Sequence, residues 1–310
     1  MIAETPTTRT YQQVQPYLFS VAYRMTGSAS DAEDLVHDAW IRYLDAGSPP
    51  VDSIRAWLTK VVSRLSLDYL KSARVKREQY AGTWMPEPVL TGALFDGPEA
   101  TVERREEVSI AFLKLLDRLT PEQRVVYVLR EALGLSHDEI AGYMDKSSAA
   151  CRQIYHRAQR RLADDRQPVI APEPAHRALA EQFLEVVQSG DVSRIAAMLT
   201  EDVTVVGDAG PGRPAPKRPI TGIAEVSRVV AGYLSATLAR AQAMRFTIAD
   251  LNGAPALVAI DGDQLAAVLA LDARGDRIAA FRGVQDPPKL AWLAREMNLQ
   301  PPADLNRNQA

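Results

Sequence analysis

Hydrophobic residues recur at helical spacing in two stretches of the first 80 residues. The stretch "SASDAEDLVHDAWIRYL" predicts a helix with Ser30 and Glu33 as a capping box, in which each side chain bonds a backbone N–H group. Its expected apolar face comprises Leu35, Val36, Ala39, Trp40, Tyr43 and Leu44. After the break "GSPP", a longer helix is predicted over residues 54–78, with an apolar stripe of Trp57, Leu58, Val61, Val62, Leu65 and Tyr69. Residues 11–80 are therefore interpreted as one helical unit.

A second set of helices is predicted over residues 104–162. Thr120 and Gln123 form a capping box with Pro121 at the first helical position, and Ser136 and Glu139 repeat the box. A short turn, "DKS", separates the second of these helices from a longer one, "SAACRQIYHRAQRRLA". The order of short helix, tight turn and longer basic helix is typical of a helix-turn-helix.

The pattern changes after the proline-rich stretch "DDRQPVIAPEPAHR". The next residues predict a helix, a short helix and a strand ending in "VTVV", and "GIAEVSRVVAGYLSATLA" predicts another helix. Four strands follow in "RFTIADLN", "PALVAID", "QLAAVLALDARG" and "DRIAAFRGV", joined by turns that contain Gly and Asp. A few helices followed by a run of antiparallel strands indicate an α+β domain, with helices packed on one curved sheet.

The segment between the two helical parts, "AGTWMPEPVL", is too apolar for a plain tether and too rich in proline for a helix. A linker stiffened by proline, with a Trp-Met pair, is expected to dock on the C-terminal domain. Docking of this kind would set the spacing between the two helical parts. The alternative is that Trp84 merely packs on the helices that follow it.

Composition places the chain among soluble globular proteins. It has 310 residues, of which 46% are hydrophobic and 24% charged, enough for two or three domains. No apolar run approaches the roughly 18 residues that span a bilayer, and "MIAETPTTRTYQQ" lacks the features of a signal peptide. The single cysteine, Cys151, fits a reducing compartment, so a cytoplasmic location is expected. Cys151 lies on an apolar stripe and is interpreted as a buried core residue rather than a redox switch.

The formal net charge is only −3, but the charges are unevenly distributed. Residues 31–38 carry four acids and no Lys or Arg, whereas residues 55–80 and 149–161 are strongly basic. Two basic segments and one acidic helix predict two surfaces that face phosphates and a separate surface that faces protein.

The basic helix over residues 148–162 carries the most specific chemistry. One face holds Cys151, Ile154, Tyr155, Ala158 and Leu162, and another holds Arg152, His156 and Arg160 beside Gln153 and Arg157. Arg and Gln side chains reach base edges, and the other cations bind phosphates. The alternative is a solvated surface helix. The helix over residues 55–77 is a second candidate, because its cations and aromatic residues suit an unstacked strand. The alternative for Trp57 and Tyr69 is that they belong to the core and do not contact a DNA strand.

The stretches around residues 17–80 and 115–162 resemble regions two and four of a bacterial extracytoplasmic-function RNA polymerase sigma factor. The resemblance implies that the acidic helix docks on polymerase core through Asp34, His37, Asp38 and Arg42. It implies contacts with the minus-ten element from the second helix, for which the candidates are Lys60, Arg64, Lys71, Arg74 and Arg77. It also implies that the minus-thirty-five element is bound by Arg152, Gln153, His156, Arg157 and Arg160.

Residues 175–286 resemble a SnoaL-like domain, an α+β cone with a pocket. Sigma factors with this extension share a linker motif close to "WLPEP", a "DGGGK" loop and a tail close to "NPDKL". Here the counterparts are "WMPEP", "DAGPGR" and "DPPKL". In the loop only the first Asp and the third residue match in place, a proline intrudes at Pro211, and the cation comes one position later. The implied interdomain residues are Trp84, Pro86, Glu87, Pro88, Asp208, Gly210, Arg213, Asp286, Pro287, Lys289 and Leu290.

The fold expected is multidomain, with two all-α sigma domains followed by the α+β cone. Region two spans residues 1–80, the first linker 81–103, region four 104–163, the second linker 164–174 and the SnoaL-like domain 175–310. No Cys/His cluster suggests a metal, and no cofactor is expected. Asp208, Asp250, Asp261 and His176 have no informative spacing for catalysis, so a regulatory domain is preferred to an enzyme, and a small-molecule ligand in its pocket is left open.

The expected partners are RNA polymerase core and promoter DNA, without a membrane and without an obligatory separate anti-sigma factor. Two alternatives stay open. One is a helix-turn-helix regulator that acts without polymerase, and the other is a SnoaL-like enzyme with a DNA-binding appendage.

Overall fold

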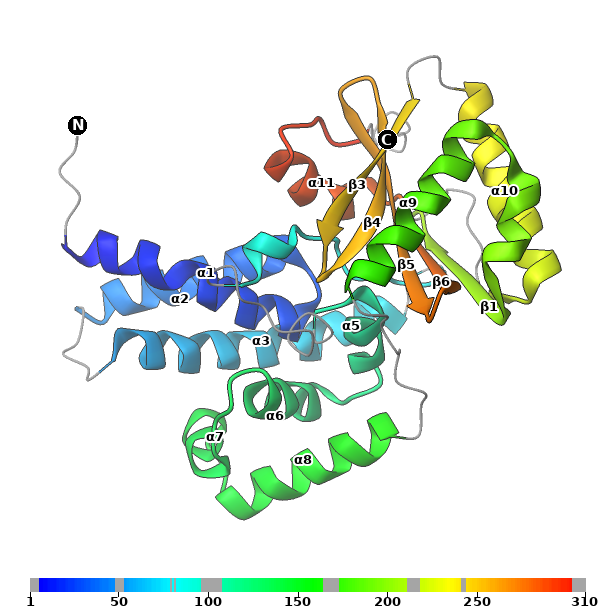
Figure 1. Ribbon diagram of the computed structural model, residues 1–310. Coiled ribbons are helices and arrows are strands. Elements are labelled where there is room, and N and C mark those ends of the chain that lie inside the picture. Colours follow the sequence, from blue (N-terminus) through cyan, green and yellow to red (C-terminus); the bar gives the residue numbers. More distant parts are fainter. Residues whose placement is uncertain are drawn as a thin grey trace. The chain divides into compact units, whose positions relative to one another are not determined.

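The computed structural model describes residues 6–47, 53–78, 80, 82–95, 108–163, 173–210, 218–240 and 244–302. The chain divides into two compact units (Figure 1). The N-terminal unit comprises Met1–Glu78, Gly92–Val108 and Phe112–Gln167. The C-terminal unit comprises Gln79–Thr91, Ser109–Ala111 and Pro168–Ala310. The proline-rich linker motif is therefore grouped with the C-terminal unit.

The N-terminal unit begins with three helices that pack against one another: α1 (Pro6–Thr26), α2 (Ala29–Asp45) and α3 (Ile54–Glu78). The predicted capping box at Ser30 is wrong. Gly27, with φ 70°, ends α1, and Ser28 caps α2 by accepting a bond from the Asp31 backbone N–H at 3.1 Å. The glycine turns the chain early, so the cap lies two residues before the predicted one.

The apolar stripe predicted for α3 is only partly right. Leu58 and Val62 are buried, but the helix also buries Thr59, Ser63 and Ser66, whereas the predicted Val61, Leu65, Trp57 and Tyr69 are half-buried. The Thr59 hydroxyl donates to the Arg55 carbonyl and the Ser63 hydroxyl to the Thr59 carbonyl, each at 2.7 Å. Because hydroxyl groups can bond to carbonyls of their own helix, small polar residues can occupy the packed face.

The rest of the N-terminal unit contains the helix-turn-helix. The short helix α5 (Ile110–Leu116) precedes α6 (Pro121–Glu131), α7 (His137–Met144) and α8 (Ser148–Ala163). Both predicted capping boxes are confirmed, at Thr120 with Gln123 and at Ser136 with Glu139. The short helix, the turn and the longer basic helix are confirmed as well.

The C-terminal unit is an α+β domain, as predicted. It runs through α9 (Glu173–Ser189), the 3-10 helix η2 (Val192–Met198), β1 (Leu199–Asp208), β2 (Ile220–Thr221) and α10 (Ile223–Arg240). The strands β3 (Met244–Leu251), β4 (Ala254–Asp261), β5 (Gln264–Arg274) and β6 (Arg277–Val284) follow, and then the helix α11 (Pro287–Glu296). The sequence pattern had not predicted α11.

The described strands form a six-stranded sheet in the order β2-β1-β6-β5-β4-β3. The strands from β3 to β6 are antiparallel neighbours, as predicted, but β1 runs parallel to β6, so the sheet is mixed. Helices α9 and α10 lie together on one side of the sheet (Figure 1). Their apolar residues, among them Phe183 and Val230, join Leu257 and Phe281 of the sheet in one buried core.

Candidate nucleic-acid interface and linker cluster

Helix α8 has one buried face and one charged, exposed face. Cys151, Ile154, Ala158 and Leu162 are buried and hold the helix on its unit. The five residues predicted to bind the minus-thirty-five element are all exposed: Arg152, Gln153, His156, Arg157 and Arg160. The charged face is therefore available to a ligand, while the buried face fixes its orientation.

The turn before α8 is short because Asp145 adopts the left-handed conformation, with φ 51°. This residue ends α7, and the Lys146 backbone N–H bonds to the Ala141 carbonyl at 3.2 Å. Asp is among the few non-glycine residues that enter this conformation readily. The reversal places α8 directly after the capped helix α7, as a helix-turn-helix requires.

Tyr155 anchors α8 to α6. Its ring lies 6.1 Å from that of Tyr127, and its hydroxyl donates to the Glu131 carboxylate. Burial, followed by the hydrogen bond to Glu131, raises the pKa of Tyr155 to about 12. The hydroxyl therefore stays protonated and keeps donating at neutral pH.

The basic residues of α3 have different environments. Lys71 is exposed and Lys60 is half-buried. Arg64 instead contacts the helix-turn-helix: its Nε donates to the Tyr143 carbonyl at 2.9 Å and its Nη2 to Asp145 Oδ1 at 2.6 Å. The side chains of Arg74 and Arg77 lie outside the described residues. Among the residues predicted to contact the minus-ten element, Arg64 is thus hydrogen-bonded to the helix-turn-helix in this structure.

The aromatic residues of α3 are packing residues. The Trp57 ring meets the Tyr43 ring edge-on, with centroids 5.3 Å apart. The Tyr69 hydroxyl donates to Asp31 Oδ2 at 2.6 Å, joining α3 to the start of α2. These contacts favour the core alternative for both residues over a role in stacking on bases.

Helix α2 presents an exposed face made of charged and apolar groups. The four residues predicted to dock on polymerase core, Asp34, His37, Asp38 and Arg42, are all exposed. Two large apolar side chains are exposed on the same helix, Ile41 at 41% and Leu44 at 46%. The prediction that Leu44 belongs to the packed face is wrong, and sequence reasoning missed Ile41. The available signal was helical spacing, because Ile41 lies four residues after His37 and three after Asp38, on their face of the helix.

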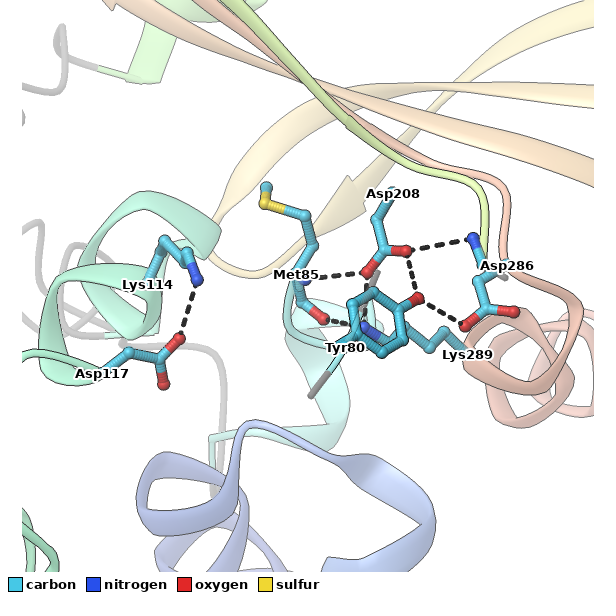
Figure 2. A network of polar contacts seen from close by, with 8 residues as sticks. Tyr80, Met85, Lys114, Asp117, Asp208, Asp286 and Lys289 are labelled. Carbon is cyan, nitrogen blue, oxygen red and sulfur yellow. Dashed lines mark hydrogen bonds and ion pairs between the residues drawn. The ribbon is translucent and has the colours of Figure 1, made fainter. Parts of the chain in front are cut away.

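The C-terminal unit holds the linker motif through a buried polar cluster. We call Tyr80, Met85, Asp208, Asp286 and Lys289 the linker cluster (Figure 2). The Asp208 carboxylate accepts bonds from the Tyr80 hydroxyl, from the Met85 backbone N–H at 2.8 Å and from Lys289 Nζ. Lys289 Nζ also donates to the Met85 carbonyl at 2.8 Å, and the Tyr80 hydroxyl lies 3.1 Å from Asp286 Oδ2.

The linker cluster is buried except for Tyr80, which is half-buried. Asp208 is 2% exposed, Lys289 7% and Met85 0%. Burial lowers the pKa of Lys289, and the carboxylates of Asp208, Asp286 and Glu87 act in the opposite direction. Burial, followed by the hydrogen bond to Asp208, raises the pKa of Tyr80 well above its ordinary value. Tyr80 therefore stays a hydrogen-bond donor at physiological pH.

A second set of bonds joins the linker to the turn between β3 and β4. Asn252 exchanges bonds with Val89: its backbone N–H donates to the Val89 carbonyl at 3.0 Å, and its Oδ1 accepts from the Val89 N–H at 3.1 Å. The Gly253 N–H donates to Thr91 Oγ1 at 3.0 Å. Asn252 has φ 52°, a conformation that asparagine tolerates, so the turn presents its amide to the linker.

Most of the predicted interdomain residues therefore lie together. Trp84 is half-buried, with Lys289 Nζ 4.3 Å from the centre of its ring. Arg213 lies outside the described residues. Sequence reasoning missed Tyr80, Thr91 and Asn252, although "NG" is a turn signal that could have identified Asn252. The other predicted members are buried or half-buried: Pro86, Glu87, Pro88, Gly210, Pro287 and Leu290.

The residues considered for catalysis are not gathered into one site. Asp250 pairs with Arg177, Asp261 is exposed, and Nε2 of the buried His176 lies 2.7 Å from the Leu271 carbonyl. Across the described part of the chain, no group of three His, Cys, Asp or Glu residues could hold a metal ion. No helix in the same part is both long and apolar enough to cross a membrane.

Comparisons with known families match three parts of the chain. The Sigma-70 region 2 model matches residues 10–75, the Sigma-70 region 4 model matches residues 109–162, and the SnoaL-like domain model matches residues 180–285. These matches follow the order of helical, helical and α+β parts that the structure has.

Two relatives are similar over nearly their whole length. The ECF RNA polymerase sigma factor SigJ of Mycobacterium tuberculosis is 35% identical over 94% of this chain and 96% of its own. A probable ECF RNA polymerase sigma factor, SigI of the same species, is 31% identical over 96% of this chain and 99% of its own. The crystal structure of SigJ matches with a TM-score of 0.71 over 91% of this chain and 98% of that one. The chain therefore belongs to the extracytoplasmic-function RNA polymerase sigma factors, and it carries a C-terminal SnoaL-like domain.

Proposed function

We propose that this chain binds RNA polymerase core in the cytoplasm and directs it to a class of promoters, where polymerase performs the chemistry. The observation that carries the proposal is the arrangement of α8, which exposes all five predicted recognition residues and buries the opposite face. Family membership supports the assignment to transcription initiation. The chain is proposed to have no catalytic residue and no cofactor of its own.

Helix α8 is the proposed reader of the minus-thirty-five element. In a helix-turn-helix, residues near the start of the second helix contact base edges, and Arg152 and Gln153 hold that position. Arg can bond guanine and Gln can bond adenine through two hydrogen bonds each. Arg157 and Arg160, further along, are suited to phosphates, and His156 lies between the two pairs. Binding should weaken steeply with salt, because each phosphate contact releases counterions.

Helix α2 is the proposed contact with polymerase core. Its exposed Ile41 and Leu44 offer apolar area, and Asp34, His37, Asp38 and Arg42 surround them with charge. Apolar groups bordered by polar ones are typical of protein–protein interfaces. The acidic start of the same helix makes it an unsuitable surface for DNA, which separates this role from that of α8 and α3.

Helix α3 is the proposed contact with the minus-ten element, through Lys60, Arg64, Lys71, Arg74 and Arg77. Lys60 and Lys71 have access to solvent, and the helix becomes more basic toward its C-terminal end. Arg64 first has to release Tyr143 and Asp145, so its use in binding DNA competes with its bonds to the helix-turn-helix.

The SnoaL-like domain is the proposed internal regulator. The linker motif is bonded to Asp208, Lys289 and Asn252 of this domain, which supports control of the linker from within the chain. A regulator that is part of the chain makes an obligatory separate anti-sigma protein unnecessary. Arg213 and the other motif residues are proposed to share in this control.

In vitro transcription with purified core polymerase and a promoter library tests the proposal. The full chain, a form ending near Asp165 and a form ending just before Asp286 are compared at equal concentration. We expect initiation from shared promoters at rates that change with truncation. If no form binds core or initiates, the chain is instead a DNA-binding regulator. If the isolated residues 175–310 turn over a small molecule, the enzyme alternative holds.

A further inference from the structure

The C-terminal unit contains an apolar cavity of about 110 Å³ between its sheet and its helices. Phe183 of α9 and Tyr233 of α10 line it on the helical side, and Phe246 of β3 lines it on the sheet. Cavities with aliphatic and aromatic walls stay dry and take up small apolar rings, as shown by a cavity of about 150 Å³ that binds benzene. The smaller volume here suits a single small ring with at most one small substituent.

Two glycines form part of the sheet surface that lines the cavity. Gly207 of β1, Gly283 of β6 and Leu269 of β5 stand in register across three neighbouring strands and all line the cavity. A Cβ built on Gly283 would come no closer to another group than 3.8 Å, at Leu269 Cδ1. A larger residue would therefore fit at this position, so the flat floor is not forced by crowding. The two glycines leave room for a planar group to lie on the strands.

The polar groups that line the cavity determine which molecule fits. Among its described lining residues Asp208 alone carries a formal charge, and its carboxylate already accepts bonds from Tyr80, Met85 and Lys289. Gln285 and the hydroxyl of Tyr233 are the neutral polar side chains of the lining. Such a lining rejects an ion, because burial of an unpaired charge is costly, and suits a neutral ring with at most one hydrogen-bonding substituent.

The cavity and the linker cluster use the same two strand ends. Gly207 and Ala209 line the cavity on either side of Asp208, and Gln285 lines it next to Asp286. The Gln285 backbone N–H donates to the Asp208 carbonyl at 2.7 Å, which ties the end of β1 to the end of β6. These strand ends therefore border the cavity, and the Asp208 carboxylate at the end of β1 also accepts a bond from the linker.

We propose that this cavity binds a neutral, largely apolar molecule with one ring, and that its occupancy strengthens the attachment of the linker to the C-terminal unit. The inference rests on the proposed function, in which the linker is the element under control. Release of the linker removes bonds that order the ends of β1 and β6, and these ends form part of the cavity wall. A ligand that needs the ordered wall therefore binds better when the linker is attached, and by reciprocity it favours attachment.

Binding is tested on the full chain with fluorobenzene, followed by fluorine NMR, and with 4-fluorobenzoate as the charged counterpart. Ala267→Leu fills the cavity, and Gly283→Ala adds a methyl group to its floor without a clash. Ala178→Leu, on an exposed position of α9, is the matched control. We expect fluorobenzene to bind the wild type and the control, and to bind both cavity variants about tenfold more weakly or worse. Equal binding to all four proteins, or binding of 4-fluorobenzoate as strong as that of fluorobenzene, would overturn the site.

Coupling is tested by hydrogen exchange of the Met85 and Val89 amides, whose acceptors are Asp208 and Asn252. Saturating fluorobenzene is expected to slow their exchange several-fold in the wild type and in Ala178→Leu, and to leave the amides of α6 unchanged. Unchanged or faster exchange at Met85 and Val89 would reject the coupling while the site itself stands. Neither measurement depends on polymerase, so a failure of the transcription test is distinguishable from a failure of this inference.

Discussion

At the scale of single residues, Asp208 and Lys289 form a buried ion pair in the C-terminal unit. Their side chains are 1% and 8% exposed, whereas the ion pair between Asp202 and Arg274 in the same unit is about half-exposed. Removing one partner of a buried pair leaves an unpaired charge in the interior, and this costs far more than the loss of a pair on the surface. The two pairs therefore serve as a matched comparison.

Lys289→Met should lower the free energy of unfolding of the C-terminal unit by about 3–5 kcal/mol, because Asp208 stays buried without its cation. Arg274→Ala should cost at most about 1 kcal/mol. Urea unfolding, followed by a probe in the C-terminal unit, measures both changes. Similar costs for the two variants would show that Lys289 contributes no more than a surface cation.

Gly210→Ala tests the glycine that the "DAGPGR" loop keeps in common with its family motif. Gly210 has φ +78°, and an added Cβ would clash with Asp286 Oδ1, so Asp286 would have to move. Gly275 has φ +63° and open space around it, so Gly275→Ala isolates the backbone cost of about 1–2 kcal/mol. We expect the loss at Gly210 to exceed the loss at Gly275 in the same urea experiment. Equal losses would mean that contact with Asp286 carries no cost.

At the scale of elements, the sequence predicted correctly those features that depend on interactions between residues close together in the chain. The capping boxes of α6 and α7 and the four strands from β3 to β6 were predicted correctly, because caps, turns and alternation act within a few residues. The buried face of α3 was not, because Ser63 and Ser66 are buried by their neighbours' packing and not by their own hydrophobicity. The bonds of Asn252 to Val89 join residues far apart in sequence, so they could not be predicted from a local pattern.

The charged face of α8 has a testable salt dependence. Arg157→Ala should lower promoter affinity and reduce the slope of log affinity against log salt by about one, because one phosphate contact is lost. Arg194→Ala, at an exposed position in η2, is the control and should change neither. Fluorescence anisotropy with a labelled minus-thirty-five duplex at several salt concentrations measures the slope. An unchanged slope for Arg157→Ala would remove Arg157 from the phosphate contacts.

At the scale of the whole molecule, the N-terminal unit places both proposed promoter readers in one compact body. A globular unit of about 150 residues has a radius of gyration of roughly 15 Å. Two promoter elements about 25 base pairs apart are separated by roughly 85 Å of DNA. The compact unit is too small to contact both elements, so α3 and the helix-turn-helix must separate before both are bound. The bonds from Arg64 to Tyr143 and Asp145 are among those that break.

A covalent bridge tests this separation. Arg64→Cys combined with Asp145→Cys can be joined by a short bis-maleimide, and burial raises the pKa of the native Cys151, which keeps that thiol unreactive. The bridged protein should fail to initiate from promoters that need both elements. Each single-cysteine variant, treated with the same reagent, measures the loss caused by its own side chain, and the bridged protein should initiate far less than either. Normal initiation by the bridged protein would show that the two parts need not separate.

The attachment of the linker to the C-terminal unit also has a reciprocal consequence. Residues Tyr80–Thr91 lie between the two promoter readers along the chain, yet their bonds are made to the C-terminal unit. If binding to both promoter elements detaches this segment from the C-terminal unit, the bonds that it makes there are lost. Binding to promoter and polymerase must then supply the free energy that those bonds contribute to the folded C-terminal unit. By thermodynamic linkage, the same coupling energy then appears as a loss of stability in the C-terminal unit when the complex forms. Attachment of the linker to the SnoaL-like domain would therefore oppose promoter binding by its own free energy.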